Sequence, residues 1–369
     1  DIAVIDYKHN GFQYNKTFFP LINLGYNPED QFLLGVGLSS HSYGFRKEPF
    51  AVSHRLSTLY APASGAFQVK YHGIFNKVFL KNDVLVNTEF VSPVLNNFYG
   101  YGNETVVDRK RPRSYYRVRY KYFQADLLLR KRFNDIVQFS IGPSYYHYWY
   151  NPEQDSYRII TDPAIVGLDS VNIYSKKNYL GFKAKFDINY TNNELFPTSG
   201  ITWNTVFSYL EGTNKNSHNL TKLNSDMVVY ASISDKNRFS AILRIGGGHI
   251  FSKNFEYFQA LNIGSNNFVR GYRKDRFAGR SMFYQSTEFR CRLFKSRSYL
   301  LPGDVGVLAY YDIGRVWMTN ENSQRWHNSF GPGLYYVPYS LVSLSLSLGI
   351  SSEEQLLNVS FGTKFNINF

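Results

Sequence analysis

Residues 357–369 read LNVSFGTKFNINF, and this stretch decides the fold. Every second residue from Leu357 to Phe369 is apolar or threonine, and the residues between them are small, polar or basic. A period of two places one face of an extended strand in an apolar medium and the other in water. The stretch is longer than the usual strand of a soluble sheet, and roughly 9 to 11 residues suffice to cross a bilayer at a tilt. It therefore predicts a strand that spans a membrane.

The same alternation recurs along the chain, at 180–190, 343–350 and 116–122. In the last of these, Tyr and Val alternate with Arg117, Arg119 and Lys121, and we expect the three basic side chains to face inward. Charged residues at this frequency could not be buried in a packed soluble core, but they suit a water-filled lumen.

The connections between these segments alternate between short turns and long loops, as in membrane barrels. The whole chain, 1–369, is predicted to be one all-β domain, a sixteen-stranded antiparallel transmembrane β-barrel. Counting back from a periplasmic C-terminus places both chain ends in the periplasm. The expected strands lie near 12–24, 31–45, 50–60, 65–76, 81–91, 114–131, 134–149, 178–191, 200–211, 222–233, 236–250, 282–295, 304–317, 326–338, 341–350 and 356–369.

Composition fits a barrel that is apolar on one face only. The 369 residues are 43% hydrophobic and 18% aromatic, yet the mean hydropathy is -0.34. The net charge of +13 does not indicate nucleic acid, because the basic residues are scattered rather than gathered on one helix or patch. We expect them to line the lumen and the rim, facing water or anionic headgroups. The single cysteine, Cys291, excludes an internal disulfide framework.

No catalytic pattern stands out, so we expect no enzymatic activity, metal or cofactor. The chain has no Gly-x-Ser-x-Gly elbow and no His-Glu-x-x-His motif, and its histidines are scattered without metal-ligand spacing. Gly246, Gly247 and Gly248 lack the Lys-Ser/Thr pair of a phosphate loop. The start, Asp1-Ile2-Ala3-Val4, lacks the layout of a secretory signal, so we expect a mature form or a fragment.

A long polar segment, about 252–281, is expected to fold into the lumen, and it contains Val269-Arg270-Gly271-Tyr272. The Arg270 guanidinium suits bidentate pairing with a carboxylate. Asp312 shares an inward face with Gly314, and Glu288 shares one with Arg290. We therefore expect Arg270 to pair with Asp312, with Glu288 close by, while Gly271 permits a backbone turn and Gly314 leaves room. The contact could regulate a gate or simply plug the barrel.

The first and last strands are expected to meet at a seam. Pro20 has no backbone N–H to donate in a strand ladder, and proline is tolerated mainly at sheet edges. Phe365, Ile367 and Phe369 lie in the strand on the other side of this seam.

These motifs together resemble the BamA/TamA-type barrels, the bacterial surface antigen family, over essentially the whole chain and most firmly over 180–369. The resemblance rests on Val269-Arg270-Gly271-Tyr272 followed by Phe277-Ala278-Gly279-Arg280, on Glu288-Phe289-Arg290, Tyr311-Asp312-Ile313-Gly314 and Phe196-Pro197-Thr198-Ser199-Gly200, and on the terminal Phe369, which is similar to the C-terminal aromatic signal of outer-membrane barrels.

The resemblance implies an outer-membrane protein that assists insertion or translocation of polypeptides through a seam that opens sideways. Its implied partners are outer-membrane lipid and lipopolysaccharide, unfolded or translocating polypeptides and accessory proteins, with no nucleic acid and no cofactor. Assembly factors of the family carry periplasmic repeat domains, for which there is no room before residue 12. Residues 32–104 resemble barrels fused to a soluble phosphoesterase-like domain. Two alternatives follow: a barrel anchor or secretion pore for a soluble, hydrolase-like domain encoded upstream, and a passive porin.

Overall fold

The computed structural model describes residues 15–27, 31–44, 47–79, 81–151, 157–162, 167–169, 172–234, 238–264, 268–299, 301–319 and 321–363. Its main element is one antiparallel sheet of sixteen strands, in which each strand pairs with its neighbours in chain order, so the predicted strand count is confirmed. No helix among the described residues is long and apolar enough to cross a membrane.

The strands of the large sheet are β1 (Lys16–Asn27), β2 (Gln31–Gly44), β3 (Lys47–Ala61), β4 (Ala66–Phe79), β5 (Asn82–Asn97), β6 (Arg117–Arg132), β7 (Val137–Tyr150), β8 (Lys177–Thr191), β9 (Gly200–Gly212), β10 (Leu220–Ser232), β11 (Phe239–Ile250), β14 (Ser281–Ser296), β15 (Gly303–Trp317), β16 (His327–Pro338), β17 (Val342–Ser351) and β18 (Gln355–Thr363). β12 (Leu261–Ile263) and β13 (Phe277–Gly279) form a separate small ribbon, and short 3-10 turns are η1 (Arg113–Tyr116), η3 (Ile159–Thr161) and η5 (Tyr257–Gln259).

The sheet has an apolar outer face and a polar inner face. Leu180 on β8 and Leu357 on β18 point outward, and each keeps 53% of its surface exposed. On the inner face, Lys183 of β8 donates to the carboxylate of Asp126 on β6 at 2.7 Å. Apolar side chains exposed on one face and ion pairs on the other are the pattern of a barrel in lipid. The inward orientation predicted for the charged residues of 180–190 is thus confirmed for Lys183.

The orientation predicted for 116–122 is wrong. Val118 and Tyr120, on β6, are buried on the inner side against Tyr257 of η5. Because side chains alternate along a strand, Arg117 and Arg119 lie on the outer face. The sequence pattern showed the period correctly, but aromatic packing on the inner side could not be distinguished from aromatic contact with lipid.

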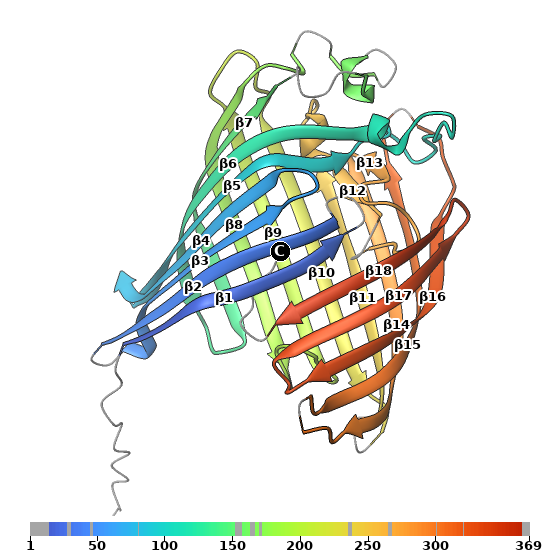
Figure 1. The fold of residues 1–369 in the computed structure, drawn as a ribbon. Coiled ribbons are helices and arrows are strands. Elements are labelled where there is room, and N and C mark those ends of the chain that lie inside the picture. Colours follow the sequence, from blue (N-terminus) through green and yellow to red (C-terminus); the bar gives the residue numbers. More distant parts are fainter. Residues whose placement is uncertain are drawn as a thin grey trace, which may run out of the picture.

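The sheet curls until its two edge strands face each other (Figure 1). Cα atoms of β1 and β18 approach within 8 Å, but among the described residues no ladder joins these strands. Pro20 falls in β1 where the register with β2 shifts between Phe18 and Leu21. The seam residues Phe365, Ile367 and Phe369 lie outside the described residues.

The segment between β11 and β14, residues 251–280, contains η5, β12 and β13 and is called the lumen loop below. It lies against the inner face of the sheet. Tyr257 and Phe258 stack among inward tyrosines of β6 and β7, such as Tyr148, whose ring centroid is 4.0 Å from that of Phe258. Ile263 and Val269 are fully buried in a second cluster against the C-terminal strands.

Candidate functional site

The lumen loop is held in shape by local contacts before it meets the wall. The Glu256 backbone N–H donates to the Gln259 side chain at 2.9 Å, part of a capping box that begins η5. Leu261 pairs with Gly279 in the β12–β13 ribbon. The ribbon brings the two ends of the segment together, so that the residues between them, including Arg270, form a compact projection.

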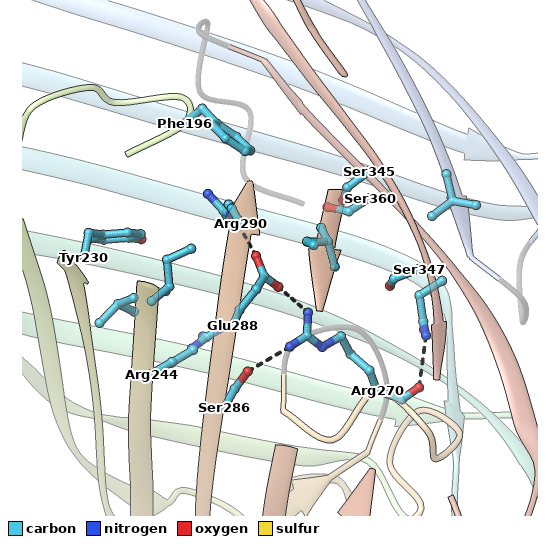
Figure 2. Close-up of a pocket in the computed structure, with 15 residues that line it drawn as sticks. Phe196, Tyr230, Arg244, Arg270, Ser286, Glu288, Arg290, Ser345, Ser347 and Ser360 are labelled. Atoms are coloured by element: carbon cyan, nitrogen blue, oxygen red, sulfur yellow. Dashed lines mark hydrogen bonds and ion pairs between the residues drawn. The ribbon is translucent and has the colours of Figure 1, made fainter. Parts of the chain in front are cut away.

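The Arg270 guanidinium meets two carboxylates from adjacent strands. Its Nε and Nη2 donate to the two Asp312 oxygens of β15 at 2.9 and 2.8 Å. Its Nη1 donates to Glu288 of β14 at 2.5 Å, and Nη2 also donates to Ser286 at 3.0 Å (Figure 2). The Arg270 backbone N–H adds a further bond to Asp312 at 3.0 Å. Bidentate Arg–carboxylate geometry is both strong and directional, so these contacts fix the position of the loop tip.

The network is buried. The Asp312 side chain has no exposed surface, and Arg270 and Glu288 keep 13% and 11%. Burial alone would lower the pKa of the Arg270 guanidinium, but the carboxylates of Asp312 and Glu288 outweigh it and raise that pKa above its ordinary value. The guanidinium carbon also lies 3.4 Å from the centre of the Tyr310 ring, a cation–π contact.

The other residues of the motif pack the loop tip against the wall. Val269 and Tyr272 are buried with Ile263. A side chain at Gly314 would place its Cβ 2.9 Å from Val269 Cγ2, so this glycine leaves room for the loop. Gly271 lies in a backbone turn, in which the Tyr272 N–H donates to the Val269 carbonyl oxygen at 3.1 Å. It has no left-handed conformation there, but a Cβ at this position would stand 2.6 Å from the Cβ of Ser329.

A small cavity of about 220 Å³ lies beside the guanidinium of Arg270 (Figure 2). Arg290 lines it and donates to Glu288 at 2.7 Å. Phe196, from the turn between β8 and β9, reaches into the lumen and places its ring 4.2 Å from the Arg290 guanidinium carbon. The turn at 192–200 is therefore more than a connection, because it packs against the opposite wall.

The contacts of the lumen loop with β18 and with the turn before it were not predicted. Asn358 of β18 donates its amide to the Arg270 carbonyl oxygen at 3.0 Å. Arg273 and Arg276 pair with Glu354 and Glu353 in the β17–β18 turn, with nitrogen–oxygen distances of 2.7 Å. The sequence shows two adjacent glutamates and, in the lumen loop, two arginines three positions apart. It contains no other signal for these ion pairs. The lumen loop is thus joined to the edge strand as well as to the wall.

A contact between two long connections centres on Asn103, between β5 and β6, which sequence reasoning overlooked. Its side-chain amide donates to Ser323 Oγ at 2.9 Å and to the Arg325 carbonyl at 2.7 Å, and the Val316 N–H donates to its oxygen at 3.1 Å. Asn103 is fully buried, so its hydrogen bonds fix the loop before β6 onto the β15–β16 connection.

Among the described residues, no three His, Cys, Asp or Glu side chains gather where they could hold a metal ion.

Solved structures with the same fold include three outer-membrane proteins. BamA from Haemophilus ducreyi lacking POTRA domains 1–3 is 15% identical over 94% of this chain and 69% of its own, with a TM-score of 0.65. CdiB from Escherichia coli is 14% identical over 93% of this chain and 61% of its own, with a TM-score of 0.58. CdiB from Acinetobacter baumannii is 13% identical over 95% and 59%, with a TM-score of 0.53. The chain therefore spans less than two thirds of either CdiB chain. No curated protein matches it.

The curled antiparallel sheet, its apolar exterior and the loop on its inner face define a β-barrel protein of the bacterial outer membrane. The Omp85 superfamily domain matches residues 64–366. The chain belongs to the Omp85 superfamily, which confirms the family expected from its motifs.

Proposed function

We propose that this protein assists the insertion or translocation of polypeptides at the outer membrane through the seam between β1 and β18. Membership of the Omp85 superfamily and the fold shared with BamA and CdiB support this function. In this proposal residues 1–369 act as one barrel domain with both ends in the periplasm, and the long connections lie on the extracellular side.

One observation carries the proposal: the two sheet edges approach each other without a ladder among the described residues. An unpaired edge presents amides and carbonyls that lipid cannot satisfy and that an incoming strand can. Strand addition of this kind is an established mode of peptide recognition.

The lumen loop is the control element in this proposal. Arg270 binds β14 and β15 through its guanidinium and β18 through its carbonyl oxygen, which accepts from Asn358. A change in the position of the loop tip therefore acts directly on the edge strand. The packing of the loop tip against the wall supports this contact, through Val269, Gly271, Tyr272 and Gly314.

The experiment places a photoreactive amino acid at Leu357 on the edge strand β18 and, as a matched control, at Leu180 on β8. Both side chains point outward with 53% of their surface exposed, so lipid contact is equal and only proximity to the seam differs. With the protein in proteoliposomes and an unfolded outer-membrane barrel as substrate, we expect cross-links from position 357 and few from position 180. Equal cross-linking from both positions would contradict the use of the seam.

Two further measurements separate the alternative functions. A passive porin would give steady conductance in planar bilayers and no stimulation of substrate folding. An anchor or secretion pore would cross-link to a soluble domain encoded in the same gene rather than to an added barrel substrate.

A further inference from the structure

The outer face of β6 changes from apolar to basic along one line of side chains. From the turn toward the long loop, the outward residues are Lys131, Leu129, Leu127, Ala125, Phe123, Lys121, Arg119 and Arg117. Lys121 and Lys131 are ten positions apart, which is close to the ~9 to 11 residues that a tilted strand needs to cross the hydrocarbon. The apolar outward side chains between Lys131 and Lys121, called the apolar stripe below, therefore span the membrane. Lys121 marks the membrane interface at the long-loop end.

The basic end of β6 is unlike that of the other strands. At the same end of other strands the outward side chains include aromatic ones, as with Tyr60 of β3, Phe67 of β4 and Trp149 of β7, and Trp149 lies opposite Lys121 in the β6–β7 ladder. Among the described sheet strands, none except β6 carries more than one Lys or Arg on the outer face within six positions of its long-loop end. Aromatic side chains are the usual residues at this interface, so the three cations of β6 require a separate explanation.

The loop before β6 extends the same charge. Arg109, Lys110 and Arg111 are exposed, and Arg111 lies 4.0 Å from Asp108. Arg113 instead pairs with Glu354 of the β17–β18 turn at 3.7 Å and is not counted with them. Residues 109–121 contain seven basic residues and no acidic one. The patch defined by Arg117, Arg119, Lys121 and residues 109–111 is called the β6 basic patch.

We infer that the β6 basic patch binds the phosphate groups of the outer-leaflet glycolipid, lipopolysaccharide. Arginine forks and lysine ammonium groups are the standard partners of phosphate. The apolar stripe below the patch favours a lipid over a soluble anion, because one glycolipid molecule offers acyl chains to Leu127 and Phe123 and phosphates to Lys121. The inference rests on the proposed orientation, with the long loops outside.

The test compares the wild-type protein with the variant R117Q/R119Q/K121Q in detergent at low salt. The probes are purified rough lipopolysaccharide and the same preparation after chemical dephosphorylation, and binding is measured by microscale thermophoresis. A cation near an anionic surface changes affinity about fivefold, so the loss of three should weaken binding roughly a hundredfold. The matched control K131Q, at the other end of the stripe, should bind like wild type, and dephosphorylation should weaken only proteins that keep the patch.

Folding of each variant is checked by heat-modifiable mobility on gels. If R117Q/R119Q/K121Q fails to fold, the exposed-loop variant R109Q/K110Q/R111Q provides the same comparison and should also weaken binding. Unchanged affinity of a folded patch variant, equal binding of dephosphorylated lipid, or the same loss for a soluble polyphosphate probe would each overturn the assignment to the glycolipid.

Orientation is tested separately with S114C in a C291S background. Ser114 is exposed in η1 beside the patch, so a membrane-impermeant maleimide should label position 114 on intact cells. Labelling only after lysis would overturn the proposed orientation together with the glycolipid site. External labelling combined with unchanged lipid binding would overturn the site alone.

Discussion

Replacing Arg270 with alanine removes the cation that joins two buried carboxylates. The change eliminates two hydrogen bonds to Asp312, one to Glu288 and one to Ser286, together with the cation–π contact with Tyr310. Removing one partner of a buried ion pair costs about 3 to 5 kcal/mol. Asp312 keeps the Ser286 hydroxyl, which donates to it at 2.7 Å, so we expect a loss near the lower limit, about 3 kcal/mol.

The assay is a double-mutant cycle on the free energy of unfolding, measured by urea titration of the protein in lipid vesicles. R270A and D312A should each destabilise by about 3 kcal/mol, and the double variant should lose about 1 to 3 kcal/mol less than the sum, because the two side chains interact directly. Protease cleavage within the lumen loop should increase in both single variants, since either change releases the loop tip.

The control is R292A. Arg292 and Asp304 form an ion pair at 3.7 Å with about a third of each side chain exposed, so its removal should cost about 0 to 1 kcal/mol. Additive losses for R270A and D312A would refute direct coupling. A loss for R270A no larger than that for R292A would refute the burial argument.

Other substitutions test the facing of β6 and the packing of the lumen loop. L127R, on the membrane-spanning stripe, should lower the free energy of unfolding by about 2 to 4 kcal/mol. Q124R, at a position that points to the inner face, should lower it by less than about 1 kcal/mol. Equal losses in urea titrations would mean that the register is wrong. G314A should cost about 1 to 3 kcal/mol and increase protease cleavage of the loop, because its new Cβ meets Val269; a fully stable G314A protein would argue against close packing. R276A should cost about 2 kcal/mol, between the values for exposed and buried pairs, and unchanged protease sensitivity of 268–280 would contradict its anchoring role.

The period-two pattern predicted the sheet because lipid imposes a strict alternation on each strand. Leu180 and Leu357 face outward as that alternation requires. The boundaries were less accurate: β5 continues to Asn97, beyond the predicted end at 91, because it pairs with β6 above the apolar band. Strand length in this region depends on the partner strand, which local sequence does not reveal.

The pairing of Arg270 could be proposed from sequence because a loop arginine has few carboxylates available on the inner face of the next two strands. The partners of Arg276 could not, since Glu353 lies 77 positions away in a turn whose position depends on the whole sheet. The inward position of Tyr120 was missed for a related reason. Its burial is created by Tyr257 and Phe258, which reach it from the lumen loop.

The hydrogen bonds of Asn103 have a consequence for the order of folding. They join residues more than 200 positions apart, with a separation of 220 for Ser323 and 224 for His327. Hairpins between neighbouring strands close short loops and form early, whereas contacts between distant residues form late because their loop-closure entropy must be overcome first. We therefore expect the long connections to cover the lumen only after β16 has joined the sheet. Until that step, the barrel is a trough that is open along one side and at its loop end.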